Sequence, residues 1–169
     1  DIVAISRDSE TFTSTEGNRP NLPPDPSMIH KDGEEHRKQR GIVAQGFSPK
    51  YIREQEPRIR EWTIEFIESK LPSGRMEIVS DLAARLPMRI IGTMLGVPVE
   101  KHDLVLSWID RFLQGGMGPQ YVTEEINEAY GEFCMHHEEM LELAAQNPDG
   151  DDLLNRWLRA EFEGEKLDE

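Results

Sequence analysis

The stretch that decides the fold is Asp32-Gly33-Glu34-Glu35-His36-Arg37-Lys38-Gln39-Arg40, followed after six intervening residues by Phe47-Ser48-Pro49. Asp32 and Glu35 have the spacing of a reciprocal capping box, in which each side chain bonds the other residue's backbone at the start of a helix. Serine is a good N-cap, and proline fits the first helical position. The stretch therefore predicts a helix from Asp32 to about Gly46 and another that begins at Ser48-Pro49.

His36 and Arg40 are four residues apart in the first of these helices, so they share a face. A histidine beside an arginine offers convergent hydrogen-bond donors, which suit a carboxylate or a phosphate. The same spacing also arises by chance, and an exposed pair without a ligand is the alternative.

Basic residues gather around the same stretch. Residues 31–60 hold eight basic and five acidic side chains, a net charge of +3, in a chain whose formal net charge is -14. A basic island in an acidic protein is a candidate docking surface for an acidic partner or an anionic ligand. The alternative is two solvated helices.

Prolines and glycines divide the rest of the chain. Four prolines between residues 20 and 26 exclude a helix, so residues 13–31 are predicted to be an irregular loop. Pro57 is predicted to break or kink its segment, and Pro87 to kink a long apolar helix over 81–96. Residues 77–79 are predicted to form a short strand. Other helices are expected over 57–71, 100–113, 122–145 and 152–162, which makes the fold class mainly α with at most one short strand.

Length and composition limit the function. A chain of 169 residues suits one domain or a large part of one. The acidic balance argues against a nucleic-acid binder, which would need a basic face. No apolar run approaches the roughly 20 residues of a membrane span, and no signal peptide is visible, so we expect a cytoplasmic location.

Two further groups deserve a chemical hypothesis. His136 and Glu139 share a helix face and suggest a metal site. A metal site needs more ligands than these two, and the alternative is a charged helix face exposed to solvent. Cys134 is the single cysteine, so an internal disulfide framework is excluded. In a helix interior it is more typical of a small apolar residue than of a nucleophile. We therefore assign no catalytic residue and no metal ligand to this chain.

The order of the motifs resembles that of bacterial cytochrome P450 monooxygenases. The stretch from Asp32 to Arg40, with Phe47-Ser48-Pro49, resembles the C-helix region of that family. The family's E helix and its exit resemble Asp81-Leu82-Ala83 to Leu95-Gly96-Val97-Pro98. Its B helix resembles Asp1-Ile2-Val3-Ala4-Ile5 to Phe12. The approach to its I helix resembles Asp151-Asp152-Leu153-Leu154 to Glu161. The resemblance covers nearly all 169 residues, although 100–145 match only in length and character.

The resemblance implies a fold, a cofactor and partners. Residues 1–169 would be part of a single P450 domain, helices B to H, without its first strands and its haem-thiolate half. His36 and Arg40 would hydrogen-bond haem propionates. Arg37, Lys38 and Lys50 would dock a ferredoxin-type electron donor. The loops 17–31 and 113–121 would border the pocket of a small hydrophobic substrate.

The departures from the family pattern matter for activity. The family's iron ligand is a Cys thiolate in a loop near the C-terminus, and Cys134 has none of that context. The acidic/Thr pair of the I helix and the Glu-x-x-Arg pair of the K helix are also absent. The sequence therefore predicts an N-terminal-half fragment that is inactive alone. The alternative is a stand-alone helical binding module without catalysis.

Overall fold

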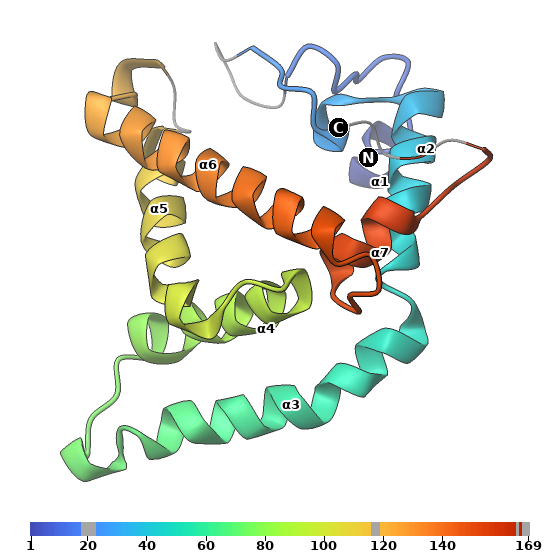
Figure 1. The fold of residues 1–169 in the computed structure, drawn as a ribbon. Helices are drawn as coiled ribbons and strands as arrows, with labels where there is room; N and C mark the ends of the chain where they lie inside the picture. Colours follow the sequence, from blue (N-terminus) through green and yellow to red (C-terminus); the bar gives the residue numbers. More distant parts are fainter. Residues whose placement is uncertain (18–22, 116–118, 165, 167–169) are drawn as a thin grey trace.

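The computed structural model describes residues 1–17, 23–115, 119–164 and 166, and these ranges contain helices and no β-strand (Figure 1). Parts of the predicted loops, residues 18–22 and 116–118, lie outside the described residues. The α-helices are α1 (Ile2–Ile5), α2 (Gly33–Gln45), α3 (Pro49–Glu68), α4 (Arg85–Leu95), α5 (His102–Gly115), α6 (Glu124–Gln146) and α7 (Leu153–Arg159). Short helical turns separate them: η1 (Met28–His30), η2 (Leu71–Ser73), η3 (Val79–Ala83), η4 (Val99–Lys101) and η5 (Pro119–Tyr121).

The main core lies where α4, α5 and α6 meet. Trp108 of α5 is 6% exposed, and its Nε1 donates a hydrogen bond of 2.6 Å to Glu132 Oε2 on α6. Because the indole's one polar atom is bonded, its large apolar surface can be buried without an unsatisfied donor. The buried residues of this cluster are Met88, Val97, Val105, Trp108, Ala129 and Met140.

A second contact joins α2 to α7, which are distant in sequence and adjacent in Figure 1. Ile42 of α2 and Leu153 of α7 are the largest fully buried side chains of the described residues. Trp157 Nε1 donates to the backbone carbonyl of Val43 over 3.1 Å. Gly46 leaves the room that this contact needs, because a Cβ there would collide with the side chains of Leu153 and Trp157.

Several predicted helix ends are confirmed. The hydroxyl of Ser48 accepts a hydrogen bond from Tyr51 N at the start of α3. Asp152 Oδ1 accepts from Asn155 N at the start of α7. Gly96 ends α4 with a φ of 82°, a conformation that favours glycine.

The predicted short strand at residues 77–79 is wrong. Glu77 N donates to Asp81 Oδ2, and Ser80 N donates to Glu77 Oε2, so the two carboxylates cap a new helical segment. The turn that follows, η3, is π-helical. Side-chain hydrogen bonds to the backbone thus outweigh the β-propensity of the Ile-Val pair.

The proline predictions also need correction. Pro57 does not break its segment, because α3 runs from Pro49 to Glu68 through it, whereas the kink expected as the alternative stays a prediction. Pro57 is exposed, so water can bond the carbonyl that the missing N–H leaves free. Pro87 is not in mid-helix: it is the third residue of α4, where a backbone N–H has no helical partner.

Candidate functional site

The start of α2 is held by Asp32, although not as the capping box predicts. Its side chain makes no cap hydrogen bond to the helix. Instead Asp32 Oδ2 accepts from Thr13 Oγ1 over 2.7 Å and from Ser14 N over 2.6 Å. These hydrogen bonds, led by that from Thr13, hold the pKa of Asp32 below its ordinary value. The carboxylate therefore ties the segment after α1 to the beginning of α2.

Ile42 fixes which face of α2 points inward, and His36 and Arg40 lie on the other side. At about 100° per residue, they are about 120° and 160° around the helix from Ile42. His36 is half-buried and Arg40 is exposed. Neither side chain forms a hydrogen bond or an ion pair with any of the described residues. Two neighbouring donors on one face are therefore available to an anionic group.

Arg37 is engaged within the chain. Its Nη1 and Nη2 bond Glu163 Oε1 and Oε2 over 2.9 and 2.6 Å, and its Nε bonds Glu34 Oε2 over 3.0 Å. The guanidinium also lies 5.4 Å from the centre of the Phe162 ring. Glu163 and then Glu34 raise the pKa of Arg37. Two carboxylates thus already offset the charge that was predicted to face an acidic donor.

Lys38 and Lys50, the other two residues predicted to dock an electron donor, differ from Arg37 and from each other in their exposure. Lys38 is half-buried, only about 40° around the helix from Ile42. Lys50 lies in the first turn of α3, where its side chain is 83% exposed and 3.9 Å from Glu54. Of the three cations, Lys50 is therefore the most accessible to a partner.

The contact of residues 162–163 with α2 was missed by sequence reasoning. Arg37 and Glu163 are 126 residues apart, and no sequence pattern links such a pair. One signal was present in Gly41, a glycine inside a predicted helix, which is unfavourable without a reason. A Cβ at Gly41 would lie 2.8 Å from the Phe162 ring, so the missing side chain makes room for that ring.

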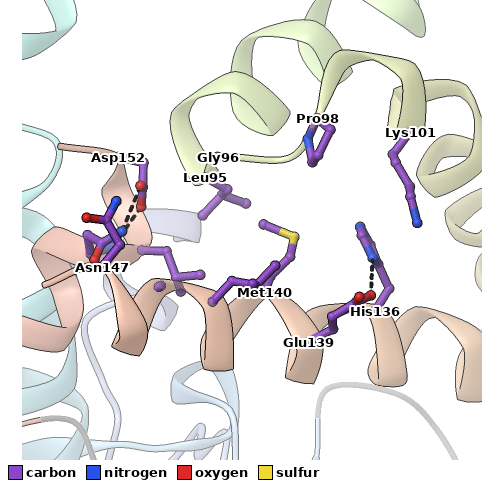
Figure 2. Close-up of a pocket in the computed structure, with 13 residues that line it drawn as sticks. Leu95, Gly96, Pro98, Lys101, His136, Glu139, Met140, Asn147 and Asp152 are labelled. Atoms are coloured by element: carbon purple, nitrogen blue, oxygen red, sulfur yellow. Dashed lines mark hydrogen bonds and ion pairs between the residues drawn. The ribbon is translucent and has the colours of Figure 1, made fainter. Parts of the chain in front are cut away.

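A cavity of about 260 Å³ lies between the end of α4, η4, α6 and α7, and no residue of α2 lines it (Figure 2). His136 and Glu139 border it, with 3.9 Å between Nδ1 and Oε2. The described part of the chain gathers no group of three or more His, Cys, Asp or Glu side chains able to hold a metal ion. His102, a histidine of another helix, bonds the Val97 carbonyl through Nε2.

No family model matches the chain, but individual relatives do. A steroid C26-monooxygenase of Mycobacterium tuberculosis is 33% identical over 172 residues, which cover 98% of this chain and 45% of the relative. Cytochrome P450 CYP107DY1 of Priestia megaterium is 29% identical, covering 85% of this chain and 35% of the relative. The chain thus spans less than half the length of the curated relatives that it matches.

Solved structures agree with these sequence relatives. Cytochrome P450 CYP109Q5 from Chondromyces apiculatus superposes with a TM-score of 0.80 and 26% identity, over 99% of this chain and 42% of that one. HmtT, involved in himastatin biosynthesis, gives a TM-score of 0.73 and 27% identity, over 95% and 44%. The helices therefore form part of the cytochrome P450 fold.

The chain belongs to the cytochrome P450 family. Haem is accordingly the cofactor of the complete protein. The donors on α2 suit such a group, since His36 and Arg40 share a face and have no competing acceptor among the described residues. In the part of the chain that the structure describes, no helix is long and apolar enough to cross a bilayer.

Proposed function

We propose that this chain is part of a single cytochrome P450 domain whose first strands and haem-thiolate half lie outside these 169 residues. The complete protein would be a monooxygenase that inserts one oxygen atom of O2 into a small hydrophobic organic substrate. Relatives named as monooxygenases, aligned over almost the whole chain, support this activity. Several of these relatives are named steroid C26-monooxygenases, which makes a steroid the first substrate to test.

His36 and Arg40 are proposed to hold the haem propionates. Both side chains lie on one outward face of α2 and lack acceptors among the described residues, and this observation carries the assignment. Hydrogen bonds from positively charged donors to carboxylates are short and strong, so the pair would neutralise and orient the propionates. Bound haem supplies the oxygen-activating chemistry. The contacts of Ile42 and Trp157 would keep α2 from moving relative to it.

The proposed clamp is tested in the complete protein by the double variant His36→Ala/Arg40→Ala. A hydrogen bond to a charged group contributes about 1.5–3 kcal/mol, so haem retention should weaken by roughly tenfold or more. The haem-to-protein ratio after gel filtration measures this loss. Arg53→Ala, which removes an exposed arginine of α3, is the matched control. A normal haem content in the double variant would remove the assigned role.

The chain alone is proposed to be inactive, because the thiolate that favours O–O cleavage must come from elsewhere. Cys134, its single cysteine, is half-buried in α6. The reduced, carbon-monoxide-treated chain with added haem should lack the absorption band of a thiolate ligand, and the complete protein should show it. The gene also distinguishes a binding module, since a stop codon after Glu169 would favour that alternative.

Electrons are proposed to come from an acidic ferredoxin-type donor that docks on Arg37, Lys38 and Lys50 in the cytoplasm. The exposure of Lys50 makes it the most informative position. Lys50→Glu should slow electron delivery several-fold at low ionic strength and less at high salt, because screening weakens surface electrostatics. Stopped-flow reduction measures the rate, with the exposed Lys166→Glu as control. A rate change that is independent of salt would contradict the docking surface.

A further inference from the structure

The cavity beside α6 has two chemically different parts. Figure 2 shows Lys101 and His136 at one end, Leu95 and Met140 in the middle, and Asn147 and Asp152 at the other. The apolar part of the lining comes from α4, α6 and α7: Leu95, Met140, Leu143, Ala144 and Leu154. The cavity is therefore amphipathic along its length.

His136 presents an unpartnered polar atom at the first end. The residue is 7% exposed, and its ring lies 5.6 Å from that of Trp108, centroid to centroid. Nδ1 faces Glu139, while Nε2 is buried and has no hydrogen-bond partner. Figure 2 shows the ring reaching toward the space between Pro98 and Lys101. Buried polar atoms are normally bonded, so this nitrogen indicates that the cavity receives a hydrogen-bonding group.

Lys101 determines the charge of that group. The side chain is half-buried in the lining, and no carboxylate of the described residues pairs with it. Burial, and next the charge of Lys101, lowers the pKa of His136, which favours the neutral imidazole. A neutral imidazole and a partly buried ammonium together favour an anionic oxygen ligand.

The remaining lining favours a monoanion with an apolar body. Glu139 lies next to His136 and would repel the second charge of a phosphate dianion. At the far end, Asp152 is already bonded by Asn155 through its backbone N and Nδ2. The apolar middle can therefore cover a hydrocarbon segment without leaving a charge unpaired.

We propose that this cavity binds a small amphipathic carboxylate, of the size of a medium-chain fatty acid. Its carboxylate would bond Lys101 Nζ and His136 Nε2, and its hydrocarbon part would lie against Leu95 and Met140. The lining contains no residue of α2, so the cavity is separate from the proposed haem clamp. The inference does not depend on the proposed monooxygenase activity.

The test is calorimetric titration of octanoate into the complete natural protein that contains this chain. We expect saturable binding that Lys101→Met and His136→Phe each weaken at least fivefold. Phenylalanine keeps an aromatic ring next to Trp108 but removes both nitrogens. Octanol, which has the same tail without the charge, should bind at least tenfold more weakly. Lys166→Met, an exposed lysine outside the lining, should leave the affinity unchanged.

Three results would overturn the proposal. Octanol and octanoate could bind equally well, which would mean that only the apolar surface matters. Binding could be the same in Lys101→Met, a variant at a partly exposed position whose fold circular dichroism can verify. The third is binding to the 169-residue chain but not to the complete protein, since another segment would then occupy the cavity.

Discussion

Helix α2 and the α5–α6 pair are held in place by different means. In α2 only Ile42 is buried, and distant segments fix the helix through Thr13, Trp157 and Glu163. The α5–α6 pair is held by its own apolar residues around Trp108. An element with one buried anchor can keep an outer face free for a ligand, whereas an element in a core uses its faces for packing. The face of α2 that carries His36 and Arg40 accordingly contributes no buried side chain among the described residues.

The same difference predicts where the fold is most sensitive, and the largest effect is expected at Trp108. Trp108→Ala removes the central side chain of the core and leaves Glu132 without its indole partner. The free energy of unfolding should fall by about 3–5 kcal/mol. Urea unfolding followed by circular dichroism measures it, with Leu104→Ala on the exposed side of α5 as control. Equal losses in both variants would contradict the assigned core.

A smaller effect is expected at Ile42, the single buried anchor of α2. Ile42→Ala should cost about 2–4 kcal/mol, because it leaves a cavity where an almost fully buried side chain stood. The loss should be concentrated locally, with faster amide exchange in α2 than in α5 and α6. Hydrogen exchange by mass spectrometry tests this, and Ile52→Ala, at an exposed position, is the control. Uniform acceleration across all helices would show that α2 is not a separate unit.

The smallest effect is expected at Asp32, which is exposed in part and acts only through hydrogen bonds. Because the folded-state pKa of Asp32 lies below its ordinary 3.8, its contribution to stability is present at neutral pH. That contribution is lost as the pH falls through the lowered pKa. Asp32→Asn should therefore speed exchange of the Ser14 amide at pH 7, and the difference should vanish in strong acid. The exposed Asp149→Asn is the control, and a difference that persists in acid would contradict this assignment.

Local chemistry explains which helix predictions succeeded. Ser48 caps α3 as predicted, and α7 begins where predicted with Asp152 as its cap, because capping involves residues within one turn. The strand predicted at residues 77–79 is absent, because the hydrogen bonds of the Glu77 and Asp81 carboxylates start a helical segment there. These bonds compete with the high β-propensity of Ile78-Val79. Asp32 had the right position for a cap, but a competing bond from Thr13 took its carboxylate. That competitor is 19 residues away and was not visible in the local pattern.

The sequence by itself determined the helical class, the common face of His36 and Arg40, and the order of motifs that resembles a P450. These features depend on a 3.6-residue period and on neighbours within a turn or two, which any reader of the chain can count. Only the tertiary structure decided that Glu163 engages Arg37, that Trp157 bonds Val43, and that His136 lines a cavity with its Nε2 unpartnered. Such contacts join residues far apart along the chain, and their geometry exists only once the helices have packed.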